Sequence, residues 1–167
     1  DGISVLPITS LALNHTVSNE RIATGIPRLD AMLGGRGFFR GSSILLTGTP
    51  GTGKTIISAN FAQAAARRGE RVLYFSFEES PDQIIRNLHS IGLRLEPLVK
   101  RGLLRFHSAR PSLYGLEMHL ATMFKEIATF KPHVVIVDPI TSLMDSGTDS
   151  EGKAMVTRLI DYLKAGQ

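Results

Sequence analysis

Residues 48–55, GTPGTGKT, combine glycines, a lysine and a terminal hydroxyl in one short stretch. They match G-x-x-x-x-G-K-[ST], the pattern of a phosphate-binding loop between a strand and a helix. Gly51 and Gly53 let the backbone turn so that successive N–H groups point inward, and the following helix adds the positive end of its dipole. We expect Lys54 to reach the β- and γ-phosphates of a nucleotide and the Thr55 hydroxyl to coordinate Mg²⁺.

Asp138 is the acidic residue that such a loop needs on another strand, where it holds the metal through water. It closes the apolar run VVIVD, and the carboxyl ends of parallel strands form the edge where ligands bind. The next residue is Pro139, which has no acid–base chemistry. A base for an attacking water must therefore come from another strand.

Glu78 and Glu79 supply that candidate base, because they follow the apolar run RVLYFSF. In a doubly wound sheet this strand can lie beside the strand at residues 43–47, so that its end faces the γ-phosphate. Adjacent strand residues point to opposite faces. We expect Glu78 to act on water or Mg²⁺ and Glu79 to join a network or interface. Alternatively, both carboxylates are solvated or favour the next helix N-terminus electrostatically.

The elements that must position these residues alternate between short apolar runs and helical patterns, which predicts a mostly parallel, twisted α/β sheet with helices on both faces. We expect strands at residues 43–47, 71–77, 103–107 and 133–138, the last of them central because it is apolar throughout. Capping boxes at Ser80/Gln83 and Thr148/Glu151 begin two helices. Further helices are expected at residues 54–68, 96–102 and 114–130.

Two regions are expected in the chain. Residues 1–40 mix short apolar pieces with Pro, Asn and Gly, which predicts an extended arm and a short helix near PRLDAML, packed on the core. Residues 41–167 are expected to form the front part of the nucleotide-binding domain. Sheets of this kind usually continue after such a helix, so we expect the sheet to be incomplete at the C-terminus.

Composition excludes several classes of function. The chain has no cysteine, and its five histidines show no metal-ligand spacing. The net charge is +4, but the arginines are dispersed, which makes a nucleic-acid surface an unfavoured interpretation. No apolar run approaches the roughly 18 residues of a membrane span, and no signal peptide is apparent. We expect a cytoplasmic protein without a membrane segment.

The combined pattern resembles the RecA-like ATPases and, more closely, the KaiC family of clock-type ATPases and autokinases. The phosphate-binding loop alone is shared by very many NTPases. Together with that loop, the glutamate pair and the aspartate followed by no catalytic glutamate indicate the RecA-like group, and the glutamate pair with the opening ATGIPRLDAMLGG at residues 23–35 makes the closer resemblance specific. It extends from about Arg21 to the end of the chain, and it is greater to the second of the family's two tandem domains than to the first.

The resemblance implies a set of site residues. Mg²⁺ would contact Thr55 and Glu78, and the catalytic carboxylates would be Glu78 and Glu79. Ser90 and Ile91 would lie on the base side of the nucleotide, although relatives often have an aromatic residue at the second position, which leaves base stacking open. With Gly48 of the loop, ATP would be bound by Thr49, Pro50, Gly51, Thr52, Gly53, Lys54, Thr55 and Ile56.

The resemblance also implies a homo-oligomeric, hexameric ring with ATP between subunits, clock-type regulatory partners and Ser/Thr autophosphorylation. The family's interface lysine and arginine and its phosphorylated residues have no counterpart in this sequence. We therefore expect the chain by itself to be a weak ATPase, since a trans-acting cation contributes roughly 10³ or more in rate.

Two other functions stay open at this point. One is a DNA-acting RecA-like recombinase or helicase, although residues 141–153 carry three carboxylates and one lysine, which is a poor surface for phosphates. The other is a slow, nucleotide-dependent assembly scaffold. A GTPase is disfavoured because no N-K-x-D motif occurs.

Overall fold

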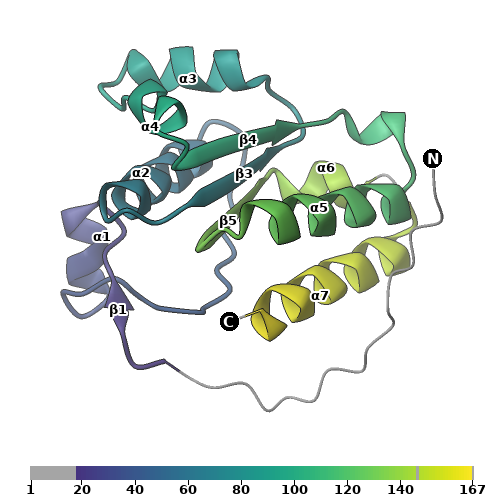
Figure 1. Cartoon of the computed structure of the whole chain (residues 1–167), viewed down its shortest axis with the longest axis horizontal. Coiled ribbons are helices and arrows are strands. Elements are labelled where there is room, and N and C mark those ends of the chain that lie inside the picture. Colours follow the sequence, from purple (N-terminus) through teal and green to yellow (C-terminus); the bar gives the residue numbers. More distant parts are fainter. Residues whose placement is uncertain (1–17, 146, 167) are drawn as a thin grey trace.

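The computed structural model describes residues 18–145 and 147–166. Three parallel strands form its main sheet, in the order β4-β3-β5 (Figure 1). They are β3 (Val72–Ser76), β4 (Leu104–Ser108) and β5 (Val134–Asp138). Ser76 at the end of β3 is the register partner of both Ser108 and Asp138, so the three carboxyl ends are level with one another.

Helices cover both faces of this sheet. On one face lie α2 (Lys54–Arg67), α3 (Pro81–His89) and α4 (Glu96–Lys100), which share a core cluster with Val72 and Tyr74. The other face carries α5 (Leu116–Phe130), α6 (Ile140–Met144) and α7 (Asp149–Ala165), around Leu73 and Phe75. A 3₁₀ turn, η1 (Pro111–Leu113), precedes α5. Figure 1 shows the two helical layers on either side of the strands, which confirms the expected α/β architecture.

The N-terminal segment forms a small antiparallel pair, β1 (Arg21–Ile22) with β2 (Phe38–Phe39), around the short helix α1 (Pro27–Met32). Asp30 Oδ1 accepts hydrogen bonds from the backbone N–H of Thr24 at 2.9 Å and from its hydroxyl at 2.8 Å. Gly25 has φ +84, and a Cβ there would lie 2.9 Å from Cβ of Ala64 in α2. The motif ATGIPRLD is therefore a clasp that joins this segment to α2. The expected arm lies largely outside the described residues.

Local signals placed the helix ends correctly. Ser80 accepts from the backbone N–H of Gln83, whose side chain accepts from the Ser80 N–H, and Thr148 and Glu151 repeat this capping box. Gly69 follows α2 with φ +85, as expected for the residue that ends a helix. Each of these patterns involves residues within four positions of one another, so each forms as soon as the local backbone does.

Two expectations about the sheet are wrong. Residues 43–47 form no strand, and within them Leu45 is 73% exposed. β3 rather than β5 is the central strand, so it is not paired with residues 43–47. An apolar, β-branched sequence favours the strand conformation, but a strand in a sheet also needs a neighbouring backbone with which to form hydrogen bonds. In the described part of the chain, β4 and β5 occupy both sides of β3, and residues 43–47 pair with neither strand.

Helix α6 is an element that the sequence did not predict. Five residues are too few to hold a helix by local hydrogen bonds alone. Leu143 is fully buried in the core cluster that includes residues of α5 and α7. Tertiary packing therefore stabilises α6.

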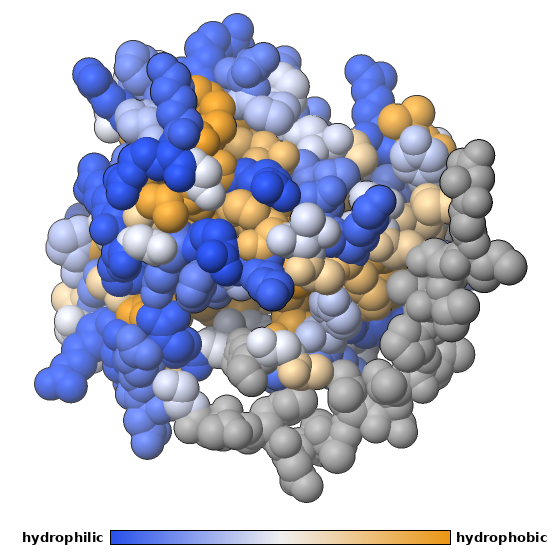
Figure 2. Space-filling view, viewed as in Figure 1, coloured by the Kyte–Doolittle hydropathy of each residue, from blue (hydrophilic) through white to orange (hydrophobic). Residues whose placement is uncertain are grey.

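The surface is mixed. Figure 2 shows hydrophilic side chains over the helices at the left and upper edges, with apolar patches between them. Among the described residues, no helix has both the length and the apolarity that a membrane crossing requires.

Candidate phosphate-binding site

The loop at residues 48–53 runs directly into α2. Gly53 is the N-cap, with φ +89, a left-handed conformation that glycine adopts without strain. The Lys54 Nζ donates to the carbonyl oxygens of Gly48 at 2.7 Å and Thr49 at 2.9 Å. The Thr52 hydroxyl also donates to Thr49 O, at 2.8 Å. The Lys54 ammonium thus lies across its own loop. Its two acceptors are neutral carbonyls, so negatively charged phosphate oxygens can replace them.

Asp138 joins the loop to the sheet. Its Oδ2 accepts a hydrogen bond from the Thr55 hydroxyl, at 2.8 Å, although 83 residues separate the two in the chain. The same oxygen accepts a second hydrogen bond from the Tyr74 hydroxyl, at 2.6 Å. The structure therefore brings together two of the three groups that the sequence predicted for a metal, Thr55 and Asp138, and it adds a tyrosine. Among the described residues no hydrogen bond connects the third, Glu78, to either of them.

Tyr74 lies in the middle of β3 and is fully buried. Burial, the negative charge of Asp138 and the hydrogen bond to Asp138 all raise the pKa of the Tyr74 hydroxyl. The phenol therefore stays protonated throughout the physiological range. It acts at Asp138 as a permanent hydrogen-bond donor.

Glu78 and Glu79 follow β3 in a bend, and both are exposed. Glu78 Oε1 accepts from the Ser142 hydroxyl of α6 at 2.6 Å, whereas Glu79 Oε1 lies 3.5 Å from Nδ2 of Asn87 in α3. The two carboxylates are thus bound to elements on opposite faces of the sheet. Within residues 18–145 and 147–166, neither forms a salt bridge.

Ser90 and Ile91 lie just beyond the C-terminus of α3. The Ser90 hydroxyl donates to Asn87 O at 2.6 Å, and the Ile91 side chain is 54% exposed. In the described residues, no hydrogen bond connects either one to the phosphate-binding loop. Their assignment to the base side of a nucleotide stays a prediction.

The donor set at Thr55 and Asp138 fits Mg²⁺. The ion prefers oxygen ligands, and it usually takes only one or two from protein while phosphate and water complete its shell. No group of three or more His, Asp or Glu side chains that could hold a metal occurs among the described residues. The site therefore suits a metal that arrives with a nucleotide, rather than one held by protein alone.

Sequence reasoning missed Tyr74 and Ser142 as parts of this site. Tyr74 has the appearance of an ordinary core residue in an apolar strand, and the position of Ser142 depended on α6. One signal could have indicated Tyr74: a buried phenol needs a hydrogen-bond partner. Only the strand order identifies that partner as Asp138.

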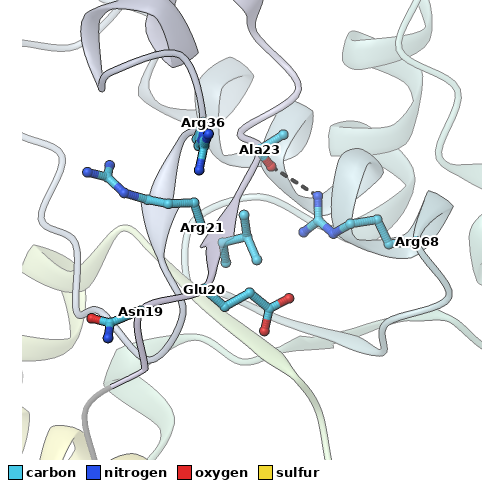
Figure 3. A pocket seen from close by; sticks show the side chains of 7 residues that line it. Asn19, Glu20, Arg21, Ala23, Arg36 and Arg68 are labelled. Atoms are coloured by element: carbon cyan, nitrogen blue, oxygen red, sulfur yellow. Dashed lines mark hydrogen bonds between the residues drawn. The ribbon is translucent and has the colours of Figure 1, made fainter.

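A separate cavity of about 550 Å³ lies beside β1, and Figure 3 shows that arginines of different elements surround it. The Arg68 guanidinium donates to Ala23 O at 3.0 Å, and Arg21 donates to two backbone carbonyls. None of the loop residues 48–56 lines this cavity, so it is not the predicted nucleotide site. Its lining is Asn19, Glu20, Arg21, Ile22, Ala23, Arg36 and Arg68.

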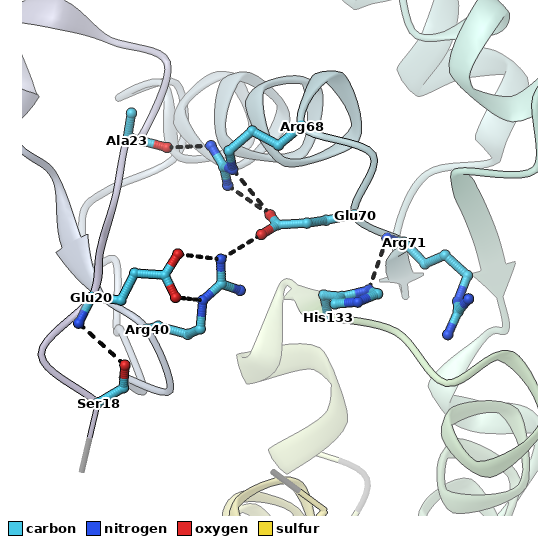
Figure 4. A network of polar contacts seen from close by, with 8 residues as sticks. All are labelled: Ser18, Glu20, Ala23, Arg40, Arg68, Glu70, Arg71 and His133. Carbon is cyan, nitrogen blue, oxygen red and sulfur yellow. Dashed lines mark hydrogen bonds and ion pairs between the residues drawn. The ribbon is translucent and has the colours of Figure 1, made fainter.

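A charged network lies next to that cavity, at the amino end of β3 (Figure 4). Arg40 contacts Glu20 and Glu70, both at 2.6 Å, and Arg68 contacts Glu70 at 2.8 Å. Burial raises the pKa of Glu70, but the hydrogen bonds from Arg40 and Arg68 and the charges of these arginines lower it by more. The net shift of the Glu70 pKa is therefore downward. Glu70 is therefore ionised and fully paired.

The parallel sheet, the glycine-rich loop at a helix N-terminus and the aspartate at the carboxyl end of β5 define a P-loop nucleotide-binding domain of RecA-like type. A protein-family profile described as "ATPase: KaiC" matches residues 22–167. The chain belongs to the KaiC family. This confirms the resemblance drawn from the sequence; the greater likeness to the second tandem domain stays a prediction.

Individual relatives agree with this assignment. The chain is 58% identical over 165 residues to the circadian clock protein KaiC2 of Synechocystis sp., covering 99% of this chain and 29% of the relative. It is 39% identical over 164 residues to the circadian clock oscillator protein KaiC of Picosynechococcus sp., covering 98% and 32%. The oscillator protein KaiC of Thermostichus vulcanus is 40% identical, also covering 98% and 32%. The chain thus spans about a third of the length of these relatives.

Proposed function

We propose that the chain binds ATP with Mg²⁺ at residues 48–56 and hydrolyses it. The hydrogen bond between Thr55 and Asp138 is the observation that carries this proposal. It joins a hydroxyl in the first turn of α2 to the carboxylate that ends β5. Membership of the KaiC ATPase family supports the nucleotide assignment.

Each residue has a role that its position supports. The loop N–H groups and Lys54 would hold the phosphates, and Thr55 with Asp138 would hold Mg²⁺, which neutralises charge on the phosphate oxygens when bound. Glu78 would orient and deprotonate the attacking water. Its carboxylate is exposed and free of any salt bridge among the described residues, so no cation competes for it. Glu79 would support the site from the α3 side.

The test is a pair of measurements on the chain. Binding of a fluorescent ATP analogue with Mg²⁺ is expected for the wild type, and Lys54→Ala is expected to weaken it at least about tenfold through loss of the phosphate-facing cation. Lys153→Ala is the matched control, because Lys153 pairs with Asp149 on the exposed face of α7. Equal affinity of the Lys54→Ala variant and the wild type would contradict the proposal.

We further propose that the longer protein assembles into a ring with ATP between subunits, takes part in a circadian clock and transfers phosphate to its own Ser or Thr. The support is the names and lengths of the relatives, which are clock proteins about three times as long as this chain. Light scattering of the longer protein with and without ATP tests assembly. Radiolabel transfer from γ-labelled ATP tests the kinase activity. A monomer at all nucleotide concentrations, or a ring that takes up no label, would contradict the corresponding part.

A further inference from the structure

The carboxylate of Asp138 is held from two directions. Its Oδ2 accepts from the Thr55 hydroxyl of α2 and from the Tyr74 hydroxyl of β3. Among the described residues, the Tyr74 hydroxyl forms no other hydrogen bond, and no buried polar side-chain atom is left without a partner. The phenol therefore serves this one carboxylate.

The strand register explains how Tyr74 reaches Asp138. Ser76 is opposite Asp138 and Tyr74 is opposite Ile136, so Tyr74 and Asp138 are diagonal neighbours two positions apart. Side chains two positions apart on a strand share a face, and diagonal neighbours are within reach of a long aromatic side chain. Tyr74 packs in the cluster under α2, the helix whose first turn carries Thr55. A shorter side chain at position 74 would not reach the carboxylate.

Thr55 cannot hold Asp138 alone while it also serves a metal. Its hydroxyl is the predicted Mg²⁺ ligand, and the terminal torsion of an aspartate is broad, so a carboxylate without a fixed donor rotates. Tyr74 is rigid by comparison, because its ring is fully buried and contacts Phe106 with centroids 5.1 Å apart. Its hydroxyl can stay on Oδ2 when the hydroxyl of Thr55 turns away.

We propose that Tyr74 is a positioning residue, whose buried hydroxyl fixes the Asp138 carboxylate beside Thr55 for the metal–nucleotide complex. This inference rests on the proposed function. Partners that orient a metal-binding carboxylate typically change metal affinity by about 10- to 100-fold when they are removed. Tyr74 acts through Asp138 and touches no reacting atom in this arrangement.

Tyr74→Phe tests the inference, because it removes the hydroxyl and keeps the ring in the core. We expect the variant to bind a fluorescent ATP analogue about tenfold more weakly than the wild type in Mg²⁺. In EDTA the two affinities should agree within about twofold, since the hydroxyl would act only through the metal site. A purely structural role would weaken binding equally in both conditions. The ratio of the affinity in Mg²⁺ to the affinity in EDTA is obtained from binding alone and needs no ATP hydrolysis.

Tyr162→Phe is the matched control. Tyr162 stacks on Phe124 with ring centroids 4.0 Å apart, in the layer of α5 and α7. The substitution also removes one phenolic hydroxyl, but away from Asp138, and we expect it to leave the affinities in Mg²⁺ and in EDTA unchanged. Urea unfolding of all three proteins checks that the folds are equally stable. If Tyr74→Phe proves less stable than the wild type, the ratio of its affinities in Mg²⁺ and in EDTA still decides, because both affinities are measured on the same protein; a ratio equal to that of the wild type overturns the positioning role.

The outcomes separate the two proposals. If the wild type binds the analogue and Tyr74→Phe binds it equally well in Mg²⁺, the positioning role is overturned and the proposed function stands. Equal weakening in Mg²⁺ and in EDTA also overturns it. If the wild type binds no analogue in either condition, the proposed function fails and the role of Tyr74 fails with it. A loss confined to Mg²⁺ supports both.

Discussion

Glutamates flank β3 at both of its ends, in opposite circumstances. Glu70, at the amino end, is 8% exposed and accepts from both Arg40 and Arg68. Glu78 and Glu79, at the carboxyl end, are exposed, and in the part of the chain that the structure describes they are bonded only to neutral side chains. Residue type is therefore a poor guide to role on this strand.

Glu70 differs from Glu78 and Glu79 in the partners that the fold places beside each carboxylate. At the amino end, Arg40 from the turn after β2 and Arg68 from the C-terminus of α2 both form salt bridges with the Glu70 carboxylate. At the carboxyl end, no described cation forms a salt bridge with either glutamate, and Lys54 hydrogen-bonds to its own loop. A carboxylate that is already paired stabilises the fold, whereas one left without a cation is available to bind a metal or activate water.

The largest expected effect is at the carboxyl end. Glu78→Gln should lower the rate of ATP hydrolysis by about 10²–10⁴-fold if Glu78 is the general base. Its free energy of unfolding should stay unchanged within about 0.5 kcal/mol, as for other surface substitutions. Phosphate release at high protein concentration and urea unfolding measure the two quantities. Glu79→Gln is the matched control, with an expected loss smaller than that of Glu78→Gln; the reverse ranking would reassign the base.

The amino end should show the opposite result. Glu70→Gln leaves two guanidiniums facing a neutral amide, and we expect it to lower the free energy of unfolding by about 2–3 kcal/mol, somewhat below the cost of breaking a fully buried pair. Affinity for the ATP analogue should not change. Glu117→Gln is the control, because Glu117 is 73% exposed in its pair with Arg158 and should contribute about 0–1 kcal/mol. A Glu70→Gln variant as stable as the wild type would contradict the conclusion that the paired Glu70 stabilises the fold.

Arg40→Lys tests whether geometry or charge holds the network. Arg40 bonds Glu20 through Nε and Nη2 and also reaches Glu70 through Nη2. An ammonium keeps the charge but not the planar fork of donors, so it cannot reproduce this pattern. We expect a loss of about 1 kcal/mol in the free energy of unfolding. No loss in a urea titration would show that charge alone suffices.

The smallest effect is a dependence on pH. The pKa of Glu70 is lowered in the folded state, so its contribution to stability is fully present above its unfolded pKa of about 4.5 and is lost as the pH falls through the lower folded value. The difference in unfolding free energy between the wild type and Glu70→Gln should therefore be constant near neutrality and shrink below about pH 4.5. Urea titrations across this range measure it. A difference that grows in acid would contradict the assignment.

The fold was predictable from the sequence where the signal was local. The capping boxes at Ser80 and Thr148, the three strands of the main sheet and the helix after the phosphate-binding loop all lie where the sequence placed them. The contact between Thr55 and Asp138 follows from the loop pattern together with the rule that ligands bind at the carboxyl ends of parallel strands. The roles of Glu78, Glu79, Ser90 and Ile91 stay predictions.

Strand order, by contrast, was beyond the reach of the pattern. The run at residues 133–138 is apolar enough for a central strand, yet β3 is central and β5 has no partner on its other side among the described residues. Residues 43–47 have the composition of a strand and no ladder. Composition describes how well a segment tolerates the strand conformation, whereas pairing depends on which backbone lies next to it.

The sequence by itself determined the phosphate-binding loop and the helix ends, because each of these depends on residues a few positions apart whose backbone geometry and hydrogen bonds are local. It also indicated the family, through motifs spread along the chain. Only the tertiary structure decided that Tyr74 hydrogen-bonds to Asp138, that Glu70 is paired, and that Glu78 and Glu79 diverge to α6 and α3. Those relations join segments up to 64 residues apart. They depend on strand register and helix packing, which no short stretch of sequence encodes alone.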